Sequence, residues 1–495
     1  MKEYEGDYTI GEFYLHSLTI SGQLKLDREN TEIYLHSKEP INSEDIRNRH
    51  IDGLLADNKR ISLIDCVTLS SGRFGGGEKD DGQNYSIVFP HYVVLGNQCI
   101  DPLEENILAL NFVVGSATSM FYDFDAFGHI LAGDLDSKDI LRSVSEKRDR
   151  KFEIGDHPEI FYYSGKHDIF KSKTCFGVMS AFHSPTMTMP SPNGISVKNS
   201  IPIRIEFDSP VLFDEAMNRF NILESFVTLV LGQPQNIEDI KVSITSDNDY
   251  PNYLDVYSCM QEDYSHITRD RTPHPSDILI NGGVEPNEFS KLLSSWLERQ
   301  ELWRDSRRQF INSFRMQNRY STDRLVASAN MFDILPEDAV GDACSISEEM
   351  KLAVANSKKV FKGLPHSSER DSILGALGRI GKHNLKTKVK YRAKFITEHI
   401  GDKLPEFELV INEAVNCRNY FVHGTYGKLS PEVSYSFSSF FTDTFEFIFG
   451  ASDLIEAGWD IKKWSDKGST YSHPFGMYLL DYHLNLKNLK GRIKA

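Results

Sequence analysis

The spacing of apolar residues changes near residue 286, and this change limits the folds that are open to the chain. Before residue 286, apolar and polar residues alternate in several short segments, as they do in strands with one buried face. These segments are 13–26, 31–37, 86–96, 107–124, 200–211 and 241–246. One segment of the same region, 213–232, has apolar residues three and four apart, which predicts a helix packed on the strands.

After residue 286 the apolar spacing is helical. One or two long helices begin there, and further helices are predicted at 348–364, 367–381, 387–401, 405–424 and 436–458. The sequence therefore predicts an α+β protein with a β-rich N-terminal domain and an all-α C-terminal bundle. Because 495 residues exceed one ordinary core, we expect a β-rich domain at 1–285, connecting helices at 286–320 and a helical domain at 321–495.

Charge is distributed unevenly between these regions. The whole chain carries a net charge of −16, made up of −20 in residues 1–300 and +4 in residues 301–495. The stretch 379–394 has seven Lys or Arg residues and no acid. A basic face of this kind binds phosphate groups, although a simple solvated helix face is the commoner reason for a charge run. The candidate phosphate-binding residues are Lys382, Lys386, Lys388, Lys390, Arg392 and Lys394.

Three further features bear on the compartment. No run of eighteen apolar residues is present, which predicts that the chain does not span a membrane. The N-terminal residues are polar and acidic, unlike a signal peptide. The six cysteines have no short CxxC spacing, which fits a reducing cytoplasm better than a disulfide framework.

The helix predicted at 405–424 carries two stripes of residues on different faces. Its apolar stripe is expected to be buried and consists of Phe407, Val410, Ile411, Ala414, Cys417 and Phe421. Its polar stripe consists of Asn412, Asn416, Asn419 and His423. Asn419 and His423 lie one turn apart on the same face, with Arg418 on the flank. Pro405 is expected to open the helix and Gly424 to end it, which would leave His423 at an open helix end.

The same residues could instead have a purely structural role, and the sequence alone favours neither role. The helix dipole favours a histidine in the last turn, and an arginine on a polar face often makes a surface ion pair. The polar stripe lowers the helix propensity of this segment, however, because Asn is a weak helix former. Such a local cost is tolerated more often at functional sites. The chain also contains a second match to the same spacing, Arg269 to His274, but Pro273 interrupts it.

The R-N-x3-H-G pattern formed by Arg418, Asn419, His423 and Gly424 lies at the end of a helix in an all-helical region. It resembles the HEPN superfamily, whose members carry R-x4-6-H with a polar residue after the arginine. A β-rich N-terminal region, beginning GEFYLHSLTISGQL, with a HEPN-like helical bundle at the other end resembles the bacterial ApeA anti-phage proteins. The resemblance in architecture covers most of the chain, whereas the motif itself covers about residues 405–424.

The resemblance implies a metal-independent endoribonuclease that acts in phage defence, with tRNA as a plausible substrate. Its catalytic residues would be Arg418, Asn419 and His423. An imidazole can give or take a proton near neutral pH, and Arg418 can hold the phosphate with two N–H donors. The ribose 2′-OH would be the nucleophile, so the expected products carry a 2′,3′-cyclic phosphate and a 5′-OH, and DNA should be inert.

Further expectations concern partners and ligands. HEPN nucleases usually pair two such helices, so we expect a homodimer or a higher homo-oligomer, with a phage-derived trigger acting on the N-terminal domain. The aromatic run from Tyr435 to Phe449 could form bundle core or a dimer seam, and core is the more common role. No HExxH, Walker or nucleophile-elbow motif is present, so we predict neither a metal nor a cofactor.

Two alternatives remain open at this point. Arg418 and His423 could be structural parts of a non-catalytic HEPN-like binding or oligomerisation protein. Alternatively, the β-rich region could bind a carbohydrate or another ligand while the helices hold copies of the chain together.

Overall fold

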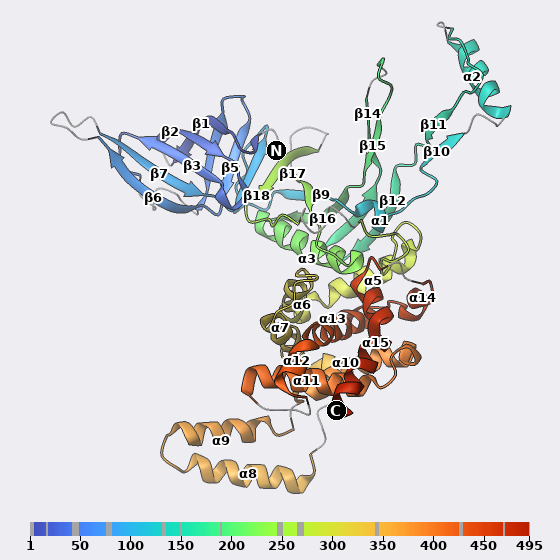
Figure 1. The fold of residues 1–495 in the computed structure, drawn as a ribbon. Coiled ribbons are helices and arrows are strands. Elements are labelled where there is room, and N and C mark those ends of the chain that lie inside the picture. Colours follow the sequence, from blue (N-terminus) through green and yellow to red (C-terminus); the bar gives the residue numbers. More distant parts are fainter. Residues whose placement is uncertain are drawn as a thin grey trace. The chain divides into compact units, whose positions relative to one another are not determined.

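The computed structural model describes most of the chain and separates into two compact units. The described residues are 4–494 except 16–17, 42–48, 76–81, 131–134, 149–150, 189–190, 245–250, 265–271, 342–345, 382, 425–428 and 469–470. The β-rich unit comprises Met1–Val227, Pro234–Pro275 and Asn281–Ser290. The helical unit comprises Thr228–Gln233, Ser276–Ile280 and Lys291–Ala495. The predicted α+β class, with strands first and an all-helical region second, is confirmed (Figure 1).

Fourteen of the described strands form one antiparallel sheet in the β-rich unit. In order across the sheet they are β12 (Asp168–Thr174), β13 (Gly177–Phe182), β16 (Ile203–Val211), β9 (Ile107–Val114), β17 (Ile237–Ile244), β18 (Asn252–Ser258), β8 (Tyr92–Gly96), β5 (Arg60–Ile64), β4 (Ile51–Leu55), β1 (Tyr8–Leu15), β2 (Leu18–Lys25), β3 (Glu32–Ser37), β7 (Gln83–Phe89) and β6 (Val67–Phe74). The inward side chains of β1 to β5, β7 and β8 form a core in which Phe13, Ile33 and Leu63 are fully buried.

Three predicted strands are divided differently from the sequence-based expectation. The segment 13–26 forms parts of two strands, because β1 turns back and pairs with β2. The segment 86–96 is split between β7 and β8 at Pro90, which has no N–H to donate to a neighbouring strand. The segment 107–124 leaves the sheet after Val114 and enters the short helix α1 (Ala117–Met120).

The helix predicted at 213–232 is confirmed as α3 (Phe213–Leu231), which packs on the sheet. Its apolar side chains recur with helical spacing, and Phe220 meets Phe112 of β9 edge-on with ring centroids 5.1 Å apart. Phe213 makes a similar contact with Tyr92 of β8. The unit also contains α2 (Leu135–Lys147) and two separate two-stranded ribbons: β10 (Phe127–Ile130) with β11 (Ile160–Tyr163), and β14 (Ser184–Met187) with β15 (Val197–Ser200).

The helical unit is built around α13 (Ser438–Glu456). The other helices are α5 (Pro286–Glu298), whose residues 286–290 belong to the β-rich unit, α6 (Gln300–Phe314), α7 (Thr322–Asp333), α8 (Glu348–Lys362), α9 (Ser368–Arg379), α10 (Leu385–Ile400), α11 (Phe407–His423), α12 (Pro431–Ser436), α14 (Ile461–Ser465) and α15 (Pro474–Lys494). Of these, α6, α7, α10, α11 and α15 pack directly against α13. The aromatic run therefore forms bundle core: Phe441, Phe445 and Phe449 of α13 are at most 1% exposed.

Buried ion pairs join α13 to its neighbours. The carboxylate of Asp453 accepts hydrogen bonds from Arg307 of α6 at 2.9 Å and from Arg299 at 2.8 Å. Both cations lie against indole rings, with the Arg307 guanidinium 3.9 Å from the ring centroid of Trp296. Two helix turns earlier, Glu446 is bound by Arg324 of α7. These pairs satisfy charges that would otherwise be costly to bury, so they fix where each helix meets α13.

The helices α8 and α9 pack mainly against each other. Neither contains a buried residue, although apolar side chains such as Leu352 and Val360 lie on α8. Within the described part of the chain, no helix is long and apolar enough to cross a membrane.

Candidate functional site

The helix α11 presents the predicted polar residues at its C-terminal end. Its buried face includes Val410, Ile411, Ala414 and Cys417, as the apolar spacing predicts. Phe421 is only half-buried, so the burial loosens in the last turn. Gly424 ends the helix in the left-handed conformation with φ of 68°, and its N–H donates to the Tyr420 carbonyl at 2.8 Å.

The start of α11 differs from the prediction. The helix begins at Phe407 rather than at Pro405, because Glu406 adopts a left-handed backbone with φ of 52°. The Pro405 carbonyl instead accepts a hydrogen bond from the hydroxyl of Tyr482 in α15. The proline therefore joins α11 to α15 and does not occupy the first helical position.

Arg418 connects α11 to the C-terminal end of α7. Its Nη2 donates to Oδ1 of Asn330 at 2.7 Å and lies 3.4 Å from Oδ2 of Asp333. Its Nη1 donates to Oδ1 of the adjacent Asn419 at 3.1 Å. The side chain is only 12% exposed, so these acceptors hold the guanidinium in one place. Its Nε–H is buried and has no hydrogen-bond partner among the described residues, whereas one Nη1–H has no acceptor among them either.

His423 has the opposite surroundings. It is exposed at the open end of α11, and its ring has no hydrogen-bond partner in the part of the chain that the structure describes. Asn419, one turn earlier on the same face, accepts the bond from Arg418 described above. The structure therefore brings Arg418 and Asn419 together and leaves the imidazole of His423 free to meet another molecule.

The residues predicted to bind phosphate lie in or next to α10. For one of them, Arg392, the prediction is wrong. Arg392 is 1% exposed and donates from Nε to Ser452 at 3.0 Å and from Nη1 to Glu456 at 3.1 Å, both on α13. A run of positive residues does not show which face of a helix each one occupies. Arg392 falls on the buried face and cannot contact RNA.

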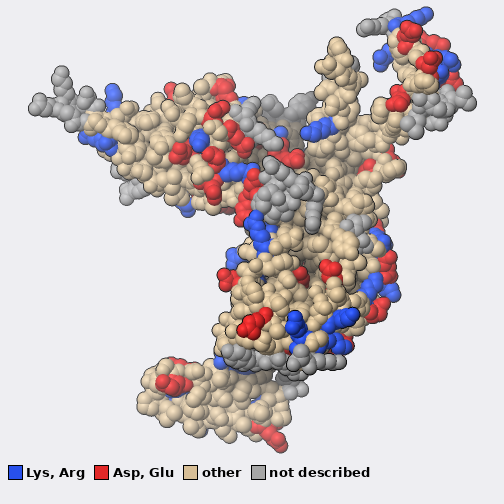
Figure 2. Space-filling view, viewed as in Figure 1, with Lys and Arg blue, Asp and Glu red and all other residues tan. Residues whose placement is uncertain are grey.

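The other basic residues of this stretch have mixed surroundings. Lys388 donates to the backbone carbonyl of Asp333 at 2.8 Å, next to the Arg418 contact, and burial lowers the pKa of its ammonium group. Lys390 is paired with Glu408, and Lys386 lies close enough to help lower the pKa of that carboxyl. Lys394 is exposed, and Lys382 lies outside the described residues. Figure 2 shows Lys and Arg side chains on the helical unit with acidic side chains among them.

Comparisons with known families account for both units. The model of ApeA N-terminal domain 1 matches residues 9–296, and the model of the Apea-like HEPN domain matches residues 326–463. The chain belongs to the ApeA family. The comparison with curated proteins found no match, and neither did the comparison with solved structures.

The HEPN match includes α7, α10, α11 and α13, and therefore includes Arg418, Asn419 and His423. Sequence reasoning missed Asn330 and Asp333, the acceptors that hold Arg418. They precede it by 88 and 85 positions, and no periodic pattern in the sequence links them to it. The only available signal was their place in the last turn of a helix in the ApeA-like bundle.

No group of three or more His, Cys, Asp or Glu side chains with the geometry of a metal site occurs among the described residues of this ApeA-family chain. The groups that the HEPN end of α11 offers to a ligand are a guanidinium, an amide and an imidazole. Together they can bind an anion and transfer a proton.

Proposed function

We propose that this ApeA-like protein is an anti-phage endoribonuclease whose HEPN domain cleaves RNA without a metal ion. The observation that carries the proposal is the end of α11. There, Arg418 is held by Asn330, Asp333 and Asn419, while the imidazole of His423 is open. The ApeA-like HEPN domain supports a role in defence and a nuclease activity. We propose tRNA as the substrate class.

Cleavage would use the nucleophile that RNA itself provides. The ribose 2′-OH attacks the adjacent phosphorus, and the 5′-oxygen of the next nucleotide leaves, which gives a 2′,3′-cyclic phosphate and a 5′-OH. His423 removes or supplies a proton at one of these two oxygens. The second Nη1–H of Arg418, which has no acceptor among the described residues, stabilises the charge on the phosphoryl oxygens in the transition state. Asn419 acts by orienting Arg418, because its side-chain oxygen accepts the Nη1–H bond.

Two copies of the chain would complete the site. The reaction moves one proton at the attacking oxygen and another at the leaving oxygen, and the described end of α11 offers one histidine. HEPN domains typically dimerise, so the second imidazole would come from His423 of a second copy. The exposed end of α11 leaves His423 accessible for such pairing.

RNA backbone would approach over the remaining basic residues. Lys386, Lys388, Lys390 and Lys394 stay in the proposal, together with Lys382. Lys388 contacts the proposed catalytic site most directly, because it donates to the backbone carbonyl of Asp333, whose side chain contacts Arg418. Binding that depends on these charges should weaken steeply as the salt concentration rises. A phage-derived trigger at the β-rich unit would start cleavage, and the protein would act in the cytoplasm.

The experiment compares the full chain with Arg418→Ala and His423→Ala on total tRNA in EDTA, with identification of the end groups. Arg308→Ala and His399→Ala are matched controls, because both side chains are exposed on other helices of the same unit. We expect cyclic-phosphate ends from the wild type and both controls, and a loss of at least 100-fold in both site variants. The same panel is tested for protection of cells against phage, where the trigger is present.

A mixture of wild type with an excess of His423→Ala tests the composite site. If each site needs His423 from both copies, a mixed dimer has only one imidazole, so the mixture should cleave less RNA than the same amount of wild type alone. Unchanged cleavage, in a mixture shown to exchange subunits, would contradict sharing of the site between copies.

One observation favours the non-catalytic alternative. Arg418 is largely buried and bridges α7 and α11, which is also what a purely structural arginine would do. On that reading, Arg418→Ala lowers stability, and wild type and both variants protect cells equally against phage. Equal protection by folded variants would remove the nuclease proposal.

A further inference from the structure

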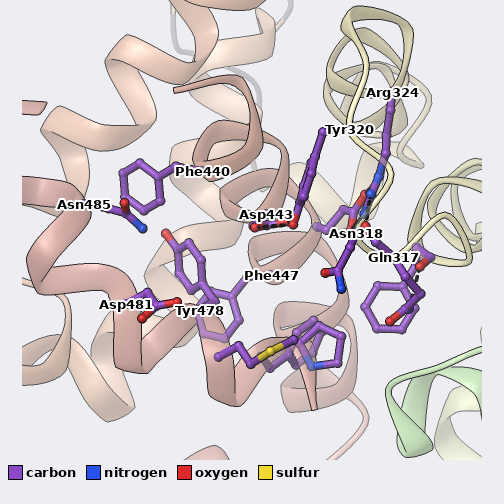
Figure 3. Close-up of a pocket in the computed structure, with 15 residues that line it drawn as sticks. Gln317, Asn318, Tyr320, Arg324, Phe440, Asp443, Phe447, Tyr478, Asp481 and Asn485 are labelled. Carbon is purple, nitrogen blue, oxygen red and sulfur yellow. Dashed lines mark hydrogen bonds and ion pairs between the residues drawn. The ribbon is translucent and has the colours of Figure 1, made fainter. Parts of the chain in front are cut away.

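The helical unit contains a cavity of about 170 Å³, lined by α13, α15 and the segment between α6 and α7 (Figure 3). None of the lining residues belongs to α10 or α11, so this cavity is separate from the end of α11 that carries His423. Its walls include six aromatic side chains, among them Phe440, Phe447 and Tyr478. Its polar residues include three acids, Asp443, Glu446 and Asp481.

The charge of Glu446 is already neutralised within the protein. Its carboxylate accepts bonds from Nε and Nη2 of Arg324 at 3.0 and 2.9 Å, and from the hydroxyl of Ser313 at 2.6 Å. Arg324 also donates to the backbone carbonyls of Gln317 and Arg319. Arg324, the one cation among the described residues that line the cavity, therefore uses four of its five N–H donors within the protein.

Asp443 has no such partner. Its two carboxylate oxygens accept from the hydroxyl of Tyr320, at 3.0 and 2.9 Å, and it has no ion pair with any described residue. Burial and the neighbouring charge of Glu446 raise the pKa of Asp443 to about 7, while Tyr320 and Arg324 oppose this rise. Asp481, one helix turn from Tyr478 on α15, adds a second acid without an ion pair among the described residues. The cavity thus places two acids that have no ion pair among the described residues close to aromatic surface.

We propose that this cavity binds a small organic cation, with its amine or guanidinium group at Asp443 and its carbon chain against the aromatic wall. A carboxylate that no protein cation reaches is satisfied best by a cationic donor. Aromatic faces attract cations and also bury the carbon chain. Phosphate-bearing ligands are disfavoured, because the two unpaired acids repel anions. Binding here does not require RNA cleavage at Arg418 and His423.

Calorimetric titration of the full chain tests this proposal with three probes: agmatine, butylamine and the uncharged butan-1-ol. We expect agmatine and butylamine to bind and butan-1-ol not to bind. Asp443→Asn should weaken agmatine binding at least tenfold, because the amide keeps the shape and still accepts from Tyr320 but carries no charge. Asp481→Asn should weaken it less. Glu398→Gln, which removes an exposed acid on α10 outside the cavity, should leave it unchanged.

Proton release gives a second readout. The cation stabilises the ionised carboxylate, so binding near pH 7 should release a proton in the wild type and not in Asp443→Asn. Comparison of the binding heat in two buffers with different ionisation enthalpies measures this release. The proposal is overturned by absence of binding of both amines at millimolar concentration. Equal binding of butan-1-ol, binding of Mg²⁺ alone, or unchanged affinity in a folded Asp443→Asn and Asp481→Asn would overturn it as well.

Discussion

Asp443 is a residue whose charge the surrounding fold leaves uncompensated, and this makes the stability of the protein depend on pH. Its pKa is 3.8 in the reference state and about 7 in the folded chain, so the folded protein binds this proton more tightly than the unfolded chain does. The side chain therefore lowers stability as pH rises from about 4 to about 7, and the full penalty remains above pH 7.

Asp443→Asn removes this penalty. At pH 8 we expect the variant to be more stable than the wild type by on the order of 2 kcal/mol, after allowance for partial solvent exposure. Near pH 4 the two proteins should be nearly equal. Urea unfolding at both pH values measures the difference. A variant that is less stable at pH 8 would show that the carboxylate is compensated by a group outside those described.

Asn330 acts on the proposed reaction through Arg418, so it is a positioning residue. Asn330→Ala removes the 2.7 Å bond to Nη2, and hydrogen bonds to charged groups contribute about 1.5–3 kcal/mol. We expect RNA cleavage to fall about tenfold, mainly in kcat, with a loss of stability of about 1 kcal/mol. Asn312→Ala, at an exposed position of α6, should change neither quantity. Asn330→Asp keeps an acceptor and should restore most of the activity.

Sequence reasoning at the residue scale succeeded where spacing along one helix carries the information. The positions of Asn419 and His423 on α11, and the end of that helix at Gly424, follow from local periodicity and backbone preference. The partners of Arg418 and the burial of Arg392 depend on α7 and α13, which pack beside these residues only in the tertiary structure. Charge composition could not distinguish Arg392 from Lys394, two positions along the same helix.

At the scale of elements, the α8–α9 hairpin contributes little to the core. Neither helix has a buried residue, and stability in helical proteins comes mainly from packing of an apolar face. We expect replacement of residues 348–379 by a Gly-Ser linker to leave the melting temperature of the helical unit within about 3 °C of the wild type. Circular dichroism on heating measures this. A drop of 10 °C or more would show that the hairpin stabilises the bundle.

The ends of three predicted helices agree with the structure, but several helices and one break between strands were missed. The helices at 348–364, 367–381 and 387–401 appear as α8, α9 and α10 with ends within two residues of the prediction. Helices α1, α2, α12, α14 and α15 were not predicted. The break between β7 and β8 was missed because both flanks are apolar, and Pro90 was the one local signal of a turn.

At the scale of the whole molecule, two compact units predict separable unfolding. Arg392→Ala leaves Glu456 without one of its two cations, and breaking a buried ion pair typically costs 3–5 kcal/mol. Leu63→Ala makes a cavity in the core of the β-rich unit, at a typical cost of 2–5 kcal/mol. We expect scanning calorimetry to show each variant lowering the temperature of a different transition. The exposed control Lys394→Ala should lower neither. A single transition, shifted by both variants, would show that the units unfold together.

The indole rings that lie against the arginines of the helical unit also give the molecule an optical property. All four tryptophans of the chain, Trp296, Trp303, Trp459 and Trp464, belong to the helical unit. Light at the long-wavelength edge of the indole absorption band, where tyrosine does not absorb, therefore excites only the helical unit. Emission spectra recorded during unfolding would identify which transition belongs to the helical unit, with no label attached and no residue changed.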